Sequence, residues 1–265
     1  MYPFSSLATF RANAFTCPCG AHLATEVFAA THGDVYWTAQ RLIGLFSLFG
    51  LGQVYLNTLE WEPWSLLEEG TFSDSQVSGL PAKRYRLDAT DTPTLSRFFE
   101  VYVPVVSGFE HLGEGPPGRS LRVAFQKFKG AIQASCTTAQ SLADAIASLE
   151  ASLLLDREHG KMTKKLRQRT AALLSHFGFQ DTDVNRCVQD AYEARSQHVH
   201  GGTVTVRQPE LDALRWTTLD YARVVLLVLA QVGIPKSEMV QQLDEGTPSA
   251  VHAHLRNVEV CWKRY

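Results

Sequence analysis

The residues best suited to chemistry lie in one short segment, Tyr192 to Gly201. Within it, Arg195 is followed directly by Ser196 and, five positions after the arginine, by His200. An arginine side chain carries a permanent positive charge that attracts phosphate, and a histidine side chain transfers protons near neutral pH. Cleavage of a phosphodiester without metal needs both, because a proton moves while charge builds on the phosphate oxygens. Arg195 and His200 are therefore the candidate catalytic residues.

Helical spacing in the preceding residues predicts where these side chains point. At about 100° per residue, Val188 and Tyr192 share an apolar face, and Arg195 lies about 20° from Val188 on that face. A guanidinium placed there needs a carboxylate, a phosphate or an interface open to water. His200 lies about 140° from Arg195 around the helix. We expect the two side chains to meet only in a cleft or across a two-fold axis between two copies.

Other residues of the segment have supporting roles in this interpretation. Ser196 is expected to hydrogen-bond a phosphate oxygen or to hold a catalytic side chain in place. His198 lies at the flank of the apolar stripe, where it either assists the site or is a solvated or interface histidine. Tyr192 is expected to pack in the core, with its hydroxyl at the polar end of the helices.

A structural alternative to the catalytic interpretation stays open. In it, Arg195 forms an ion pair with an acidic residue such as Glu150, and His200 only caps the carbonyl groups at the end of its helix. Glu150 is expected to be an ion-pair partner rather than a catalytic acid.

Basic residues gather in a second segment, between Arg157 and Arg169. Lys161, Lys164, Lys165 and Arg169 are candidates for contact with an RNA backbone, because cations neutralise its phosphates. A run of charges is also typical of a solvated helix face, so both interpretations are kept.

The elements that must position these residues are helices. Apolar residues at helical spacing predict six of them after about residue 90. The expected helices span residues 95–106, where Pro104 breaks the stripe late, 121–132, 142–153, 166–177, 184–199 and 211–232. The last is apolar on most sides, as expected of the central helix of a bundle. The predicted fold class is mainly α, with a helical bundle over residues 91–235 and a helical extension over residues 236–265.

Residues 1–90 have a different character. The first 80 residues contain two basic and seven acidic residues, and turn-forming residues cluster around 78–93. We expect a small irregular α or α+β region of unknown role there, with a buried helix within residues 35–49 and a domain boundary near residue 90.

Composition limits the class of protein. The chain has 265 residues, is 45% hydrophobic and has a net charge of −2, which excludes disordered and fibrous classes. No apolar run reaches the roughly 20 residues of a membrane-spanning helix, and no secretion signal precedes Cys17. Five cysteines, an odd number spread along the chain, indicate reduced thiols. We therefore expect a cytoplasmic protein that does not contact membranes.

No metal or other cofactor is expected. Cys17 and Cys19, with His22 and His32, form one metal-like cluster, but no second cysteine pair completes a zinc site. The glycines within residues 50–53 lack the lysine and hydroxyl of a phosphate-binding loop, and the chain has no nucleophile elbow.

Over residues 95–235 the chain resembles HEPN domains, most closely the Apea-like HEPN group. The resemblance lies in three stretches: Ala147 to Glu150, the basic Lys161 to Arg169, and Tyr192 to Gly201. The last carries the signature of the family, an arginine, four residues and a histidine, near the end of a late helix. What the resemblance implies is a helical bundle that forms a homodimer, in which two such motifs make one composite site with Arg195 and His200 as catalytic residues.

The resemblance also implies an activity. Many active HEPN domains are metal-independent endoribonucleases of toxin and phage-defence systems. By this analogy the 2′-hydroxyl of the RNA attacks the adjacent phosphate and leaves a 2′,3′-cyclic phosphate. RNA and a second copy of the chain are the expected partners, and an antitoxin or other regulatory partner is a further candidate. Other members are not catalytic, so the alternative is a module that binds RNA or nucleotide, or a protein-interaction domain.

Overall fold

The chain is mainly helical and divides into two compact units. The computed structural model describes residues 8–12, 25–29, 42, 44–51, 58–62, 70–73, 89–110, 118–132, 137–158, 160–202, 206–245 and 253–263. One unit comprises residues 1–106 and 262–265, and the other comprises residues 107–261. The dividing line falls inside α2 (Thr92–Glu110), later than the turn-rich segment near residue 90.

Pro104 lies inside α2 without ending it, although the sequence predicts a break there. Proline has no N–H, so the carbonyl of Glu100, four residues earlier, loses its helical partner. Both residues are exposed, and water can satisfy that carbonyl. The helix therefore continues for six residues beyond the proline.

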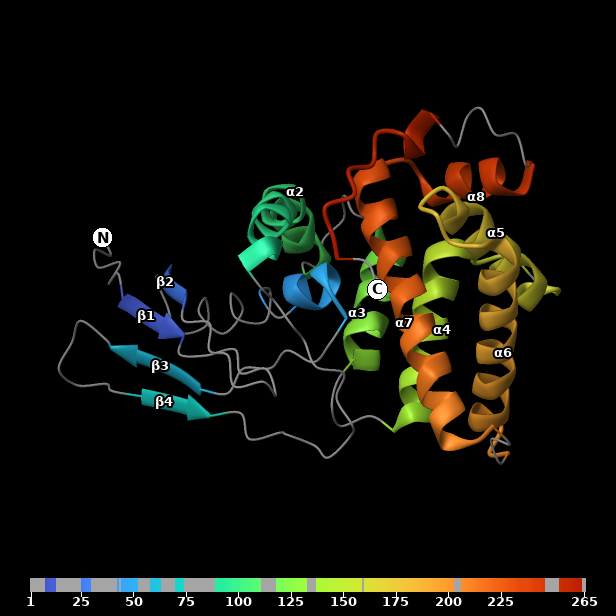
Figure 1. The fold of residues 1–265 in the computed structure, drawn as a ribbon, viewed down its shortest axis with the longest axis horizontal. Helices are drawn as coiled ribbons and strands as arrows, with labels where there is room; N and C mark the ends of the chain where they lie inside the picture. Colours follow the sequence, from blue (N-terminus) through green and yellow to red (C-terminus); the bar gives the residue numbers. More distant parts are fainter. Residues whose placement is uncertain are drawn as a thin grey trace. The chain divides into compact units, whose positions relative to one another are not determined.

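The first unit contains a four-stranded antiparallel sheet, labelled in Figure 1. Its strands are β1 (Ala8–Ala12), β2 (Thr25–Ala29), β3 (Thr58–Glu62) and β4 (Gly70–Ser73), in the order β2-β1-β3-β4. β1 pairs on both sides, so that Phe10 lies opposite Val27 in β2 and Trp61 in β3. The described part of residues 1–90 thus combines strands with helical residues at 44–49.

Aromatic side chains form the described core of this unit. The ring of Phe98 lies 4.6 Å from that of Tyr102 and meets Phe49 edge-on at 5.3 Å, measured between centroids. Phe46 meets Phe99 edge-on at 5.5 Å. Such tilted and edge-on pairs favour a fixed packing beyond the area they bury. They hold the helical residues 44–49, which lie within the predicted helix at 35–49, against α2.

The C-terminal segment is only partly helical, which corrects the expected helical extension over residues 236–265. α8 (Lys236–Glu245) and a helical turn at 253–255 are followed by non-helical residues up to Lys263. The backbone N–H of Lys263 donates to the carbonyl of Phe49 at 2.8 Å. Phe49 belongs to the first unit, and residues 262–265 belong to that unit as well.

The second unit is a helical bundle built around α4 (Figure 1). Besides α4 (Thr138–Leu153) and α8, it contains α3 (Arg119–Ile132), α5 (Met162–Ser175), α6 (Asp181–Val199) and α7 (Gln208–Val232). α4 packs against α3, α6 and α7, and α5 packs against α6. The bounds agree with the predicted helices to within a few residues. Local signals explain this agreement: Thr137 caps α4, and Gly233 ends α7 with a φ of +66°.

α7 is enclosed on all sides over its second half. Every residue from Thr218 to Val228 is buried, which confirms its prediction as a central helix. The buried guanidinium of Arg223 forms an ion pair within the helix, since its Nη2 lies 2.6 Å from Oδ1 of Asp220. None of the described helices is by itself long and apolar enough to cross a membrane; α7 and α8 meet that test only together, across a bend of 113°.

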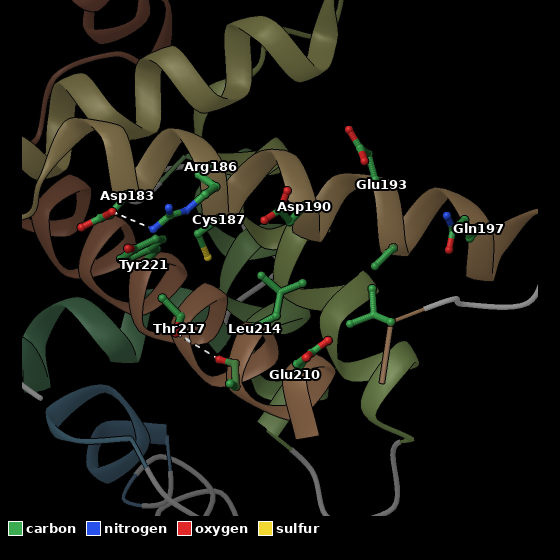
Figure 2. Close-up of a pocket in the computed structure, with 13 residues that line it drawn as sticks. Asp183, Arg186, Cys187, Asp190, Glu193, Gln197, Glu210, Leu214, Thr217 and Tyr221 are labelled. Atoms are coloured by element: carbon green, nitrogen blue, oxygen red, sulfur yellow. Dashed lines mark hydrogen bonds and ion pairs between the residues drawn. The ribbon is translucent and has the colours of Figure 1, made fainter. Parts of the chain in front are cut away.

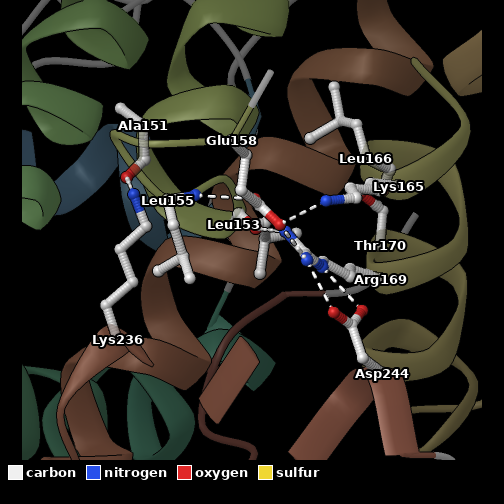
Figure 3. Close-up of polar contacts among 10 residues, drawn as sticks. All are labelled: Ala151, Leu153, Leu155, Glu158, Lys165, Leu166, Arg169, Thr170, Lys236 and Asp244. Atoms are coloured by element: carbon white, nitrogen blue, oxygen red, sulfur yellow. Dashed lines mark hydrogen bonds and ion pairs between the residues drawn. The ribbon is translucent and has the colours of Figure 1, made fainter. Parts of the chain in front are cut away.

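A buried ion cluster joins α5, α8 and the segment after α4 (Figure 3). Arg169 is 1% exposed and donates to both carboxylate oxygens of Glu158 at 2.6 Å, to Asp244 at 2.6 and 2.8 Å, and to the Leu153 carbonyl at 2.8 Å. Lys165 adds a bond of 2.8 Å to Glu158. The hydrogen bonds from Arg169 hold the pKa of Glu158 far below its usual value. The cluster therefore fixes α8 against α5.

Candidate functional site

The end of α6 is shaped by glycine. His200 leaves helical geometry with φ −87° and ψ 12°, and Gly201 takes a φ of +71°. The N–H of Gly202 donates to the carbonyl of Gln197 at 2.8 Å. This closure is a Schellman-type cap, which favours glycine at the left-handed position. The cap sets the position of His200 at the exposed end of α6.

Arg195 faces α4, where it forms the ion pair that the structural alternative predicts. Its Nη2 and Nη1 lie 3.3 and 3.4 Å from the two carboxylate oxygens of Glu150. The guanidinium carbon lies 5.4 Å from the centre of the Tyr192 ring. The ion-pair distances are long, because charge-assisted hydrogen bonds usually measure about 2.7 to 2.9 Å. The side chain of Arg195 stays 27% exposed.

The carboxylate of Glu150 is poorly compensated by its partners. Burial raises its pKa, while the charge of Arg195 and a hydrogen bond with Tyr192 lower it, and the net change is upward. The two partners thus replace only part of the hydration that the carboxylate loses. Arg195 is oriented by this pair, and its exposed edge can still receive a second anion.

The remaining signature residues surround this pair. His198 Nε2 lies 3.4 Å from Oε1 of Gln140 on α4, and the side chain is half-buried. Ser196 is also half-buried, and its carbonyl accepts the backbone N–H of His200 at 3.1 Å. Among the described contacts of a single chain, none brings His200 to Arg195, in agreement with the angle between them on the helix.

The four basic candidates of the second segment differ in their settings. Lys161 and Lys164 are exposed, and Lys161 precedes α5 in the left-handed region with a φ of 53°. Lys165 is half-buried and pairs with Glu158. Arg169 uses all its donors on internal acceptors, so the expectation that it contacts RNA is corrected. Charge alone did not reveal this difference, because the acceptors lie on other elements.

A groove that sequence patterns had not indicated runs between α6 and α7 (Figure 2). It has a volume of about 800 Å³. α6 lines it with Asp183, Arg186, Asp190, Glu193 and Ala194. Asp183, Arg186, Asp190 and Glu193 recur every three or four positions, which places them on one face of the helix. The spacing of these residues is visible in the sequence, but it indicates a groove only when α7 is known to lie beside this face of α6.

Apolar and uncharged side chains also line the groove. Ala213, Leu214 and Tyr221 line it from α7, and Cys187 lines it from α6. Burial raises the pKa of the Cys187 thiol to about 11 and that of the Tyr221 hydroxyl to about 12. Both groups therefore stay uncharged near neutral pH, and the charge of the groove comes from its rims.

The metal-like cluster of Cys17, Cys19, His22 and His32 lies outside the described residues. Within the part of the chain that the structure describes, no group of three or more potential ligand side chains could hold a metal ion.

No family model matches the chain, and comparisons with curated proteins and with solved structures found no match.

Proposed function

We propose that the protein is a metal-independent endoribonuclease of the HEPN type, with Arg195 and His200 as its catalytic residues. The observation that carries this proposal is the contrast between two arginines of the bundle. Arg169 is 1% exposed and held at 2.6 to 2.8 Å, whereas Arg195 is 27% exposed and held at 3.3 and 3.4 Å. A purely structural arginine has no need of this looseness. It suits a cation that must also bind a phosphate.

The chemistry balances with the groups of this site and the RNA itself. The 2′-oxygen of one nucleotide attacks the adjacent phosphorus, and the bond from phosphorus to the 5′-oxygen of the next nucleotide breaks. A proton leaves the 2′-hydroxyl and another reaches the departing 5′-oxygen; His200 transfers one of them, and the solvent takes up or supplies the other. Arg195 stabilises the charge that develops on the phosphate oxygens. The products are a 2′,3′-cyclic phosphate and a 5′-hydroxyl.

The proposal includes a composite site at a homodimer interface. His200 and Arg195 are not in contact within one chain, so a second copy would supply the missing partner across a two-fold axis. Val199, next to His200, is 59% exposed although it continues the buried stripe of α6. An apolar side chain at this position suits an interface that begins where the bundle ends.

The test is single-turnover cleavage of a generic RNA in excess chelator, with a parallel binding titration. His200→Ala is expected to lower the cleavage rate by about 10² to 10⁴ while RNA still binds, because a proton-transfer group is lost. Arg195→Ala is expected to impair both binding and cleavage. Analysis of the new ends should find the cyclic phosphate.

Matched control variants are available on the same unit. Arg186→Ala removes an exposed arginine from another face of α6, and His254→Ala removes a histidine outside that helix; both should cleave like the parent. Cleavage that chelator abolishes and a divalent ion restores would contradict the proposal and move the site elsewhere.

The second candidate function is a non-catalytic HEPN module. The two hydrogen bonds between Arg195 and Glu150 favour this alternative, because they give the guanidinium a partner within the chain. If the protein binds RNA but cleaves it in no buffer, the non-catalytic function is supported. Absence of both would leave the segment from Tyr192 to Gly201 as a helix end in a protein-interaction domain.

A further inference from the structure

The groove between α6 and α7 lies on a face of α6 that the proposed ribonuclease site does not use. Arg195 faces α4, whereas the groove is lined from α6 by residues such as Asp190 and Glu193 (Figure 2). From Asp183 to Gln197 these residues span about 21 Å at 1.5 Å per residue. A helix of about 14 residues has this length.

The geometry of the bundle explains why the groove exists. α4 packs against both α6 and α7, and these two helices contact each other less closely than either contacts α4. The residues that line the space between them include two alanines, Ala194 on α6 and Ala213 on α7, whose short side chains fill little of it. An apolar trough between two helices is the kind of surface into which a third helix packs.

The rims of the groove are acidic. Asp183, Asp190, Glu193 and Glu210 line it, against the single cation Arg186. Asp183 pairs with Arg186 at 2.9 Å, and Glu210 pairs with Arg207, the residue that precedes α7. Among the described residues, Asp190 and Glu193 have no cationic partner, although Glu193 accepts a hydrogen bond from Gln189.

This charge excludes two occupants. RNA would bring phosphates against the carboxylates of the rims. A second copy that used the same face would bring one acidic surface against another, because a two-fold interface is built from identical patches. The occupant must therefore be cationic on its flanks and apolar along its centre.

We propose that this groove binds a basic amphipathic helix of a different protein. The apolar stripe of that helix packs on Ala194, Ala213 and Leu214, and lysine or arginine side chains at its flanks pair with Asp190 and Glu193. The inference does not rest on the ribonuclease proposal. It gives the bundle a second surface, through which a protein partner binds without covering Arg195.

The experiment measures fluorescence anisotropy of a synthetic 14-residue helical peptide with a stripe of leucine and alanine between flanking lysines. The full-length protein should bind it. The double variant Asp190→Asn, Glu193→Gln should bind roughly tenfold more weakly and lose the salt dependence, since two exposed charge pairs are removed. Ala213→Phe, which fills the trough without changing charge, should weaken binding as strongly. Glu238→Gln with Glu245→Gln, which removes two exposed charges of α8 outside the groove, should bind like the parent.

Two further peptides separate the contributions to binding. The same peptide with glutamate in place of lysine, and one with the same composition in a scrambled order, should both bind at least roughly tenfold more weakly. Equal binding of either peptide, or unchanged binding by the double variant or by Ala213→Phe, would overturn the proposal. A loss of RNA binding in the groove variants, with native circular dichroism, would also overturn it by assigning the groove to RNA.

Discussion

At the scale of single residues, Arg195 and Arg169 differ although each faces a glutamate. The bonds of Arg169 are short and numerous, and the pKa of Glu158 is strongly lowered as a result. The bonds of Arg195 are long, and the pKa of Glu150 is raised by burial despite them. The pair of Arg169 and Glu158 stabilises the folded state. The pair of Arg195 and Glu150 instead holds the carboxylate of Glu150 where burial favours its neutral form.

Glu150→Gln tests the role of this second pair as a positioning contact for Arg195. Because the folded-state pKa of Glu150 is raised, its ionisation opposes folding above its unfolded pKa. The variant should therefore unfold at pH 7 with a free energy no lower than that of the parent. Lowering the pH through the raised pKa should stabilise the parent relative to the variant. Urea unfolding of the parent and the variant at pH 7 and at pH 4.5 measures the two differences in unfolding free energy.

The same variant should separate binding from chemistry if Arg195 is catalytic. Loss of a negative charge near the phosphate should leave RNA affinity equal or higher, while the looser guanidinium should lower the single-turnover rate by about tenfold. Glu238→Gln, an exposed change on α8, provides the control. An unchanged rate would show that Glu150 does not position Arg195.

At the scale of elements, the ion cluster around Arg169 determines how firmly α8 is held. Arg169→Met should destabilise the fold by about 3 to 5 kcal/mol, because the buried guanidinium is lost and both Glu158 and Asp244 lose an ion-pair partner. Asp244→Asn should cost about 1 kcal/mol or less, since Asp244 is 48% exposed. Chemical denaturation gives both values, and hydrogen exchange should locate the added opening in α8. Equal losses for the two variants would contradict this ranking.

The pH dependence of this cluster has the opposite sign to that of Glu150. The lowered pKa of Glu158 contributes stability that is present above its unfolded pKa and is lost only as the pH falls through the much lower folded value. The difference in unfolding free energy between the parent and Glu158→Gln should therefore persist at pH 5 and decline in more acidic solution.

The cap of α6 is a second feature at this scale. Gly201→Ala should destabilise the protein by about 1 kcal/mol, because a side chain disfavours the left-handed backbone that Gly201 adopts. A Cβ there would meet nothing within 4 Å, so the cost is confined to the backbone. Gly118→Ala, where a Cβ also meets nothing and φ is not positive, is the matched control. RNA cleavage should fall in Gly201→Ala alone, since the cap positions His200.

At the scale of the whole molecule, the composite-site proposal predicts a homodimer that light scattering should detect. Inactive His200→Ala protein, co-refolded in about ninefold excess with a fixed amount of parent, should reduce the activity to about a tenth if each site needs both histidines. Activity that stays constant would show that each site needs only one His200. Val199→Glu should favour the monomer and lower cleavage.

Much of the helical bundle could be predicted from the sequence alone. α3 to α7 follow from apolar residues three and four positions apart, and Gly201 and Gly233 mark two of the helix ends. These signals are local, because a helix is made of contacts between residues near in sequence. The same reasoning placed Arg195 on the apolar face of α6 and named Glu150 as its partner in the structural alternative.

Only the tertiary structure decided which charges are buried. Lys164 and Arg169 look alike in the sequence, yet Arg169 is enclosed by Glu158 and by Asp244, which lies 75 residues away. The groove and the return of Lys263 to Phe49 likewise depend on elements far apart in the chain. Burial of a polar group is a property of all the elements packed around it. Local spacing therefore predicts the helices and their faces, whereas the partners of those faces are set by the fold.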